Sequence, residues 1–217
     1  MKIIGLTGSI GMGKSTAANT FRRLRIPVFD ADAAVHRLQA KGGAAVAPIE
    51  AAFPGTTSHG RVDREALRRR VLGDAGALRV LERIVHPLVR RAERTFLAAA
   101  RRRGEALAVL DIPLLFETKG EKRVDTVIVV SAPAAVQRAR VLRRGGMTPE
   151  RLAAILARQV PDAEKRRRAD HIVHTGLSRH AAQRQIRAIL RTLKSPLPPA
   201  GGEGWVRESS FTRPEAS

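Results

Sequence analysis

The sequence of 217 residues contains no cysteine and no tyrosine, and only one tryptophan and six phenylalanines. The absence of cysteine excludes disulfide bonds, thiolate nucleophiles and cysteine-bound metals. Cytosolic proteins seldom use disulfides, so a chain without cysteine fits that compartment. We therefore predict a cytoplasmic protein that is stabilised by an ordinary hydrophobic core, for which this length is ample.

Long apolar runs are also absent. A membrane-spanning helix needs about 20 apolar residues, and no run in the sequence approaches that length. The first apolar segment, residues 2–7, is shorter than the apolar region of a signal peptide and leads directly into a glycine-rich loop. We therefore expect no membrane association and interpret residues 2–7 as a buried strand.

Acidic side chains are scarce: 20 of them stand against 40 basic residues, 33 of which are arginines, and the net charge is +20. Such a charge attracts nucleic acid, or it serves clefts that grip phosphorylated small molecules. A third interpretation is that arginine simply covers solvated faces. Proteins that bind RNA or single-stranded DNA usually place stacking aromatics among their basic residues. The basic clusters of this chain contain none, so we predict no nucleic-acid partner.

The motif G-x-x-x-x-G-K-S, a P-loop, follows the first apolar segment and precedes a helical pattern at residues 16–24. Its glycines let successive N–H groups point at an anion, and the helix start adds positive potential. We expect Lys14 to reach the β- and γ-phosphates of a nucleotide and Ser15 to bind Mg²⁺. A chance match is the alternative, and the flanking strand and helix argue against it. The predicted loop contacts are Gly8, Ser9, Ile10, Gly11, Met12, Gly13, Lys14 and Ser15.

A second short strand, residues 27–30, ends in Asp30-Ala31-Asp32 and is followed by helical sequence. Parallel strands joined by helices place their carboxyl ends, and hence their ligands, at one edge of the sheet. Asp30 and Asp32 should therefore face the same crevice as the P-loop. The alternative for Asp32 is the N-cap of the following helix, a common role for aspartate that does not exclude catalysis.

Residues 42–106 contain no convincing strand. Gly-Gly and Pro-Gly pairs separate helical pieces, and Asp63 is placed to cap a helix over residues 64–72. A longer amphipathic helix is predicted from about residue 87 to residue 103. We interpret this block as a helical insert on an α/β core, and its arginine runs as mainly solvated helix faces.

A third buried strand, residues 107–113, contains Asp111 near its end. In P-loop proteins an aspartate on such a strand lies near Mg²⁺. The alternative is a polar strand end that caps something local. Residues 125–130 form a strongly β-branched run and predict a further buried strand.

An arginine-rich helical pair comes next. Residues 134–144 are helical, a Gly-Gly pair follows, and Thr148-Pro149-Glu150 starts a helix that should run through Gln159. Such a pair suits a lid that closes over phosphates and neutralises their charge. A solvated basic helix is the alternative for any one arginine, and it is the stronger interpretation for the run at residues 166–168.

The sequence then predicts a final strand at residues 170–174 and a closing amphipathic helix at residues 178–193. His171 and His174 cannot share one strand face, because only alternate residues do, so we assign them no metal. Residues 195–217 are rich in proline, glycine, serine and glutamate, and we expect a disordered tail.

Several motifs together resemble the dephospho-coenzyme A kinase family, within the nucleoside-monophosphate-kinase group of P-loop kinases. The resemblance covers roughly residues 1–190, and its P-loop alone is shared by many families. More specific motifs are D-A-D at residues 30–32, H-P-x-x-R at residues 86–90 and D-x-P-L-L-F-E at residues 111–117. The set is completed by residues 137–144, 157–159 and 169–170.

This resemblance implies an α/β fold of the P-loop NTPase type, a three-layer sandwich on a five-stranded parallel sheet with a helical substrate-binding insert and a helical lid. It implies one kinase domain over residues 1–194. The parts would be a core of residues 1–35, 107–140 and 170–194, an acceptor-binding insert of about 36–106, and a lid of about 141–169. The implied reaction uses ATP and Mg²⁺ to phosphorylate the ribose 3′-hydroxyl of dephospho-coenzyme A. Its products are ADP and coenzyme A, and it is the last step of coenzyme A biosynthesis.

The resemblance also implies roles for single residues. Asp32 would act on the attacking hydroxyl, with Lys14 and Arg144 as the other catalytic residues. The further ATP contacts would be Thr16, Arg140 and Arg144. The acceptor would be held by Asp32, His86, Arg90, Leu115 and Glu117, and His86 has the equal alternative of a residue that starts a helix. The metal would be bound by Ser15 and Asp111. The sequence departs from the family pattern at Gly145 and His174, where acids are more usual.

Two other functions stay open. Another small-molecule kinase would share the P-loop and lid but not the combination of D-A-D and P-L-L-F-E. A nucleic-acid-dependent ATPase or a GTP switch would belong to a different class. The guanine motif Asn-Lys-x-Asp is absent, which argues against the switch. We expect ATP and dephospho-coenzyme A as substrates, and a monomeric protein.

Overall fold

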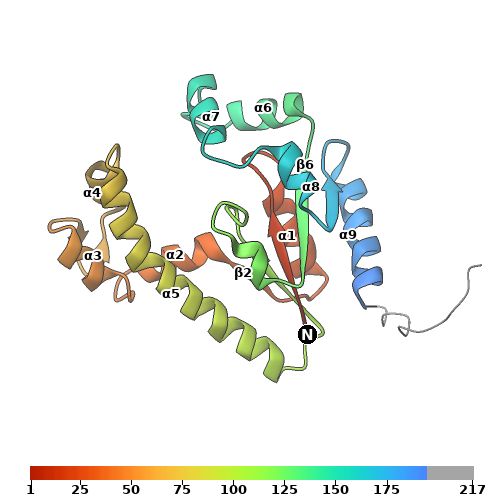
Figure 1. Cartoon of the computed structure of the whole chain (residues 1–217), viewed down its shortest axis with the longest axis horizontal. Helices are drawn as coiled ribbons and strands as arrows, with labels where there is room; N and C mark the ends of the chain where they lie inside the picture. Colours follow the sequence, from red (N-terminus) through yellow and green to blue (C-terminus); the bar gives the residue numbers. More distant parts are fainter. Residues whose placement is uncertain (195–217) are drawn as a thin grey trace, which may run out of the picture.

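The computed structural model describes residues 1–194, which form a five-stranded parallel sheet with helices packed on it (Figure 1). The strand order is β2-β5-β1-β6-β7. These strands are β1 (Lys2–Thr7), β2 (Val28–Asp30), β5 (Leu107–Asp111), β6 (Thr126–Ser131) and β7 (His171–His174). The tail predicted at residues 195–217 lies outside the described residues.

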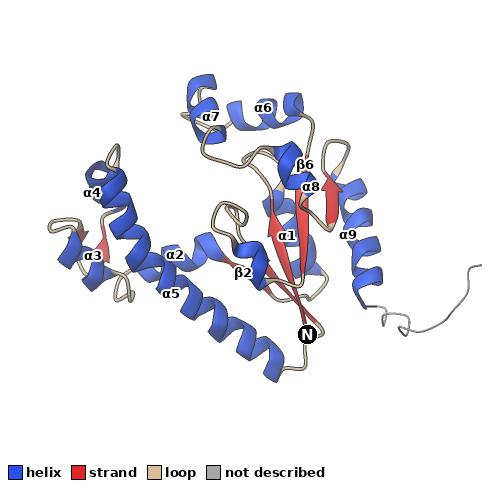
Figure 2. Cartoon of the chain, viewed as in Figure 1, coloured by secondary structure: helices blue, strands red, loops and turns tan. Residues whose placement is uncertain are grey.

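Helices occupy most of the chain between the strands (Figure 2). The helices are α1 (Lys14–Arg23), α2 (Ala31–Gln39), α3 (Val46–Ala52), α4 (Arg64–Val71), α5 (Ala75–Arg102), α6 (Ala134–Leu142), α7 (Pro149–Leu156), α8 (Asp162–Arg167) and α9 (Arg179–Lys194). A 3₁₀ turn, η1, spans Gly120–Arg123, and the short strands β3 (Thr57–Ser58) and β4 (Arg61–Val62) pair with each other. None of the helices within residues 1–194 is both long enough and apolar enough to span a membrane.

Both faces of the sheet are covered, because its strands are apolar on both sides. Residues of α1 and α9, such as Phe21 and Ile186, pack with Ile4 and Val109 on one face. Residues of α2 and of the C-terminal half of α5, such as Leu97, pack on the opposite face. The three-layer α/β architecture expected from the sequence is therefore confirmed.

Strand register brings the predicted acidic residues to one edge of the sheet. Asp111 in β5 lies opposite Leu6 in β1 and also opposite Asp30 in β2. The P-loop leaves β1 immediately after this point, at Gly8. The carboxyl ends of these three strands therefore meet where the phosphate-binding loop begins, as the topology rule for parallel sheets requires.

A separate apolar cluster lies in the segment between β2 and β5. It is built on Ile49, Phe53, Leu67 and Val85, which come from α3, α4, α5 and the turn after α3. In Figure 1 this cluster's helices lie to one side of the sheet, and α5 runs from them to the sheet. The division into core, insert and lid remains a proposal, and this second cluster supports the insert.

Two expectations for the insert were wrong. The long helix starts at Ala75, capped by the Asp74 carboxylate, and Pro87 lies inside it. A proline within a helix costs about 3 kcal/mol, but α5 packs apolar residues against the insert on one side of Pro87 and against the sheet on the other. That burial outweighs the local penalty. The insert also contains strand, because the β3–β4 pair forms a small hairpin there.

The cap expected at Asp63 is confirmed: its Oδ1 accepts from the N–H groups of Glu65 and Ala66 at 3.0 Å. The helix start at Thr148 is also confirmed, with Pro149 in the first turn. That helix ends at Leu156 rather than Gln159. The Arg158 and Gln159 N–H groups bond to carbonyls three residues back, so the last turn tightens before Pro161.

Candidate active site

The P-loop owes its shape to glycines with left-handed backbone conformations. Gly11 has φ 78°, and Gly13, directly before α1, has φ 90°, a region that other residues disfavour. Among the described residues no side chain caps α1. The N–H groups of Thr16 and Ala17 bond back to Gly13 O, and those of Lys14 and Ser15, at the very start of the helix, are available for phosphate oxygens.

A cavity of about 620 Å³ lies beside the loop. Besides the P-loop residues, its lining includes Asp32, Pro113, Arg140, Arg143, Arg144, Ile155, Gln159, Thr175, Ser178, Arg179 and Ala182. Five of the lining side chains are cations, counting Lys14, and Asp32 supplies the one carboxylate. A cavity with this charge balance suits a polyphosphate ligand.

Lys14 is paired at the base of the cavity. Its Nζ lies 2.6 Å from Asp111 Oδ1. Only 4% of Asp111 is exposed. Burial raises the pKa of this carboxyl, and the Lys14 ammonium opposes that rise. The pair therefore holds the Lys14 cation next to the loop, where a phosphate can compete for it.

Asp30 and Asp32 have different environments. The Asp30 carboxylate is the N-cap of α2, where its Oδ1 accepts from the Ala33 N–H at 2.9 Å, and it also lies 3.3 Å from Arg22. The alternative that Asp32 caps this helix is therefore wrong. Asp32 is exposed in the first turn of α2 and lines the cavity, without a hydrogen bond or ion pair to any residue of the described part. Its carboxylate is available for a substrate.

Arg140 is held in place by a residue that the sequence analysis missed. Its guanidinium donates to Thr175 O at 2.7 Å and to Thr175 Oγ1 at 3.1 Å. The Thr175 hydroxyl in turn donates to Met12 O in the P-loop, at 2.7 Å. One side chain after β7 thus connects the lid helix to the loop. A lone threonine after a short strand carries no pattern that would have identified it.

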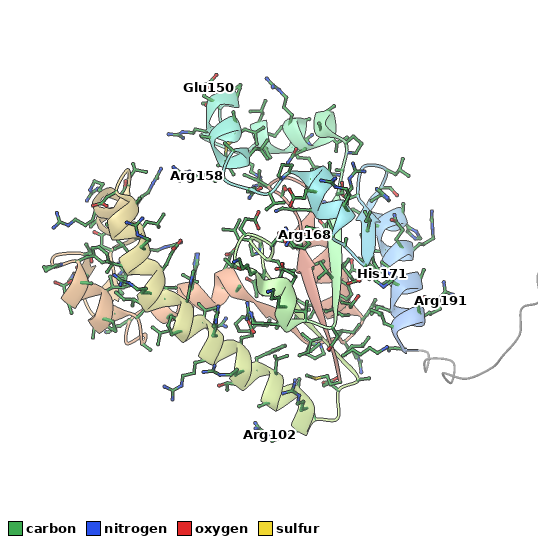
Figure 3. All side chains as sticks on the ribbon, viewed as in Figure 1. Arg102, Glu150, Arg158, Arg168, His171 and Arg191 are labelled. Carbon is green, nitrogen blue, oxygen red and sulfur yellow. The ribbon has the colours of Figure 1, made fainter. Side chains whose placement is uncertain are left out.

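Arg143 and Arg144 follow α6 and are exposed at the cavity. Neither has an ion-pair partner among residues 1–194. The run at residues 166–168 is less uniform than the solvated run that we expected. Arg168 pairs with Glu121 at 2.7 Å and lies 4.3 Å above the Phe116 ring. Figure 3 shows Arg168, the residue after α8, near the middle of the molecule, whereas Arg102 projects at its periphery.

Several predicted acceptor residues lie outside the cavity lining. His86 and Arg90 are exposed on α5, in the interior of the helix, so the alternative that His86 starts a helix is wrong. The Leu115 side chain is completely buried in the core. Glu117 bonds to the base of the lid instead: its Oε1 accepts from the Val160 N–H at 2.9 Å and lies 2.9 Å from Lys165 Nζ. Their roles toward a substrate remain predictions.

The Glu117–Lys165 ion pair leads to a prediction about the free energy of unfolding. Lys165 is 0% exposed, and removing one partner of a buried ion pair leaves an uncompensated charge that typically costs about 3–5 kcal/mol. Glu117→Gln keeps an acceptor for the Val160 N–H but loses the charge, so the free energy of unfolding should fall by about that amount. Urea denaturation measures it.

The matched double variant, Glu117→Leu with Lys165→Met, removes both charges together and should recover most of the lost stability. If Glu117→Gln instead leaves stability unchanged and raises only the acceptor KM, the pair is not a structural anchor. That result would favour direct binding of the acceptor by Glu117.

Known proteins resemble this chain over most of its length. A curated dephospho-CoA kinase of Mesorhizobium japonicum is 59% identical over 194 residues, which cover 89% of this chain and 98% of that protein. One of Paramagnetospirillum magneticum is 60% identical over 205 residues, covering 94% and 97%. A crystal structure of a Thermus thermophilus protein has 37% identity and a TM-score of 0.78, over 89% of this chain and 98% of the other.

A dephospho-CoA kinase structure from Campylobacter jejuni, with 22% identity and a TM-score of 0.62 over 88% and 97% of the two chains, supports the fold. The family model described as dephospho-CoA kinase matches residues 2–179. That match includes the P-loop, both aspartates of D-A-D and the arginines at the cavity. The chain therefore belongs to the dephospho-CoA kinase family.

Proposed function

We propose that this protein transfers the γ-phosphoryl group of ATP to the ribose 3′-hydroxyl of dephospho-coenzyme A, giving ADP and coenzyme A. One observation carries the assignment of the site. The unpaired Asp32 carboxylate lies in the same 620 Å³ cavity as the P-loop and the lid arginines. A carboxylate among cations is what a phosphoryl acceptor hydroxyl needs beside a bound polyphosphate.

The chemistry divides between charge neutralisation and alignment. Lys14 and the loop N–H groups bind the β- and γ-phosphates, while Arg140 and Arg144 neutralise the charge that spreads over the transferring group. Asp32 aligns the 3′-hydroxyl and accepts its proton as the hydroxyl oxygen bonds to the γ-phosphorus. The bond from that phosphorus to the bridging oxygen breaks, and ADP takes the electron pair. Closure of the lid keeps water away.

Magnesium fits this donor set. Within the described residues no group of three or more histidines and acids could enclose a metal by itself. Mg²⁺ commonly binds through one or two protein oxygens together with phosphates and water. The Ser15 hydroxyl at the cavity and the Asp111 carboxylate at its base are suitable donors. Bound there with the nucleotide, Mg²⁺ would supply further positive charge to the phosphates.

The acceptor would lie on the side of the cavity that faces the insert. Asp32 is on α2, which leads from the sheet into the insert. His86 and Arg90 lie one helical turn apart on α5 and both are exposed, so they can reach a bound acceptor from one helix face. Leu115 would contribute through its backbone, since its side chain is buried. We further propose that the protein acts as a cytoplasmic monomer.

The decisive test is an ADP-release assay with ATP, Mg²⁺ and dephospho-coenzyme A, with mass detection of coenzyme A. A panel of nucleotide and sugar-acid acceptors and a nucleic acid run alongside. Phosphorylation of dephospho-coenzyme A far above the other acceptors is the expected result. Preferred turnover of another acceptor would assign a different kinase, and ATP hydrolysis that depends on nucleic acid would assign an ATPase.

The lid arginines give a paired prediction. Arg144→Ala should lower kcat by about 10²-fold or more, because it removes a cation that neutralises the transferring phosphoryl group. Arg167 is exposed on α8 and does not line the cavity, so Arg167→Ala should change kcat less than about twofold. Steady-state kinetics of the two variants test this. Equal losses would remove the basis for giving Arg144 a special role.

A further inference from the structure

Both backbone hydrogen-bonding groups of one P-loop residue, Ile10, bond to glutamine side chains. Gln137 Nε2 donates to Ile10 O at 2.7 Å. Gln159 Oε1 accepts from the Ile10 N–H at 3.3 Å. Gln137 lies on α6 and Gln159 follows α7, so the two contacts come from the two halves of the arginine-rich helical pair.

Each glutamine is itself fixed. Gln137 is only 7% exposed, and α6 packs so closely on the loop that a Cβ at Gly11 would meet Val141 at 2.5 Å. Gln159 is followed by Val160, whose N–H is bound by Glu117. The burial of Gln137 and the fixed backbone beside the half-buried Gln159 mean that these bonds constrain the loop more than a contact from a mobile surface residue would.

The same helix carries the lid arginines. Arg140 is three residues after Gln137 and Arg144 is seven, which places all three on one side of α6 and its C-terminal end. The bond from Gln137 to the loop therefore also fixes how far the backbone of α6, from which these arginines extend, lies from the phosphate-binding loop.

We propose that Gln137 and Gln159 are positioning residues that hold the P-loop in its phosphate-binding conformation before ATP binds. Ordering a flexible loop costs free energy, and that cost lowers the affinity for ATP. A loop that is already ordered before binding avoids this cost. The inference rests on the proposed function in taking this loop as the ATP site. It adds that the lid acts on the loop in the empty enzyme, besides closing over the bound nucleotide.

Gln159→Met removes the acceptor while keeping the length of the side chain. In nucleotide-free protein, amide hydrogen exchange at Ile10 should accelerate by about threefold to tenfold, since one hydrogen bond typically contributes about 1 kcal/mol. The dissociation constant for ATP should rise by a similar factor. The melting temperature and the exchange of the core strands should stay unchanged, which separates this effect from general destabilisation.

Replacing each glutamine by glutamate, which can accept a hydrogen bond but cannot donate one when ionised, tests the direction of each bond. Gln159→Glu keeps an acceptor, so Ile10 should stay protected in the nucleotide-free protein. Gln137→Glu places an ionised acceptor against the Ile10 carbonyl and cannot donate, so exchange across the loop should increase. If both glutamates behave alike, the two bonds do not hold the loop.

The chain offers a matched control in Glu50 of the insert, whose Oε1 accepts from the Gly55 N–H at 2.8 Å, far from the P-loop in the fold. Glu50→Met should accelerate exchange at Gly55 and leave exchange at Ile10 and the ATP dissociation constant unchanged. The same change at Ile10 in Glu50→Met as in Gln159→Met, or unchanged or tighter ATP binding in Gln159→Met, would overturn the proposal. Wild-type turnover of dephospho-coenzyme A in the same series tests the proposed function separately.

Discussion

Replacing Lys14 by alanine should reduce kcat by at least about 10²–10³-fold, the loss expected when one preorganised group that stabilises transition-state charge is removed. Lys14 is the first residue of α1, and its Nζ lies 2.6 Å from Asp111 Oδ1. When ATP binds, the ammonium can move to the phosphates and follow the transferring group. The measurement is coenzyme A formation by a variant whose circular dichroism spectrum matches that of the wild type. Near-normal turnover in the folded variant would contradict the assignment.

The same substitution has a pH signature. Burial already raises the pKa of Asp111, and Lys14 opposes that rise. In Lys14→Ala the opposition is lost, so the pKa of Asp111 should rise further. A carboxyl whose folded pKa lies above its unfolded value favours folding at acidic pH and loses that contribution as the pH rises through the folded pKa. The stability deficit of Lys14→Ala should therefore grow with pH. The control compares the double variant Lys14→Ala with Asp111→Asn against Asp111→Asn alone. Neither protein has the carboxyl at residue 111, so the difference in stability between them should not depend on pH in this range.

Replacing Asp32 by asparagine should lower turnover by about 10²–10⁴-fold, the range typical of general acid–base catalysis. Asparagine is nearly isosteric and keeps hydrogen-bonding capacity, but it is a poor base. Because Asp30 is the residue that caps α2, the substitution leaves the cap intact. ATP affinity and melting temperature should therefore stay close to those of the wild type.

ATP affinity, melting temperature and turnover are best measured on one preparation. Asp30→Asn is the matched control: it keeps a capping side chain at the helix start and should retain most of the activity. If Asp32→Asn binds ATP normally and still turns over, Asp32 is not the base. The role would then shift to Asp30 or Asp111, the other carboxylates at this edge of the sheet.

The phosphate site follows from local sequence. The P-loop motif fixes a strand, a turn and a helix within about 20 residues, and the alternation of apolar strands with helices fixes a parallel sheet. Asp30 and Asp111 then reach the edge of that sheet through strand register alone. For these residues, both the type of side chain and its place in the fold can therefore be predicted from the P-loop and the strands next to it.

Other features depend on contacts between segments that are distant in the sequence, and no local sequence pattern predicts those contacts. Thr175 connects Arg140 to the P-loop only because β7 brings it there. Pro87 suggested a helix start, yet α5 continues through it because burial on both sides outweighs a missing hydrogen bond. Within D-A-D, only the structure tells which aspartate caps the helix and which stays free.

The long helix α5 has a mechanical consequence. Its 28 residues span about 42 Å at 1.5 Å per residue, with Ile84 and Leu88 packed in the insert and Leu97 and Ala100 packed on the sheet. Pro87 lies near the change from one core to the other. Because proline has no N–H, the helix lacks one backbone bond at that place, and bending stiffness is lowest there. The compliance of this helix is therefore concentrated at its insert end, next to Leu88 of the insert cluster, and a bend there leaves the packing of Leu97 and Ala100 on the sheet undisturbed.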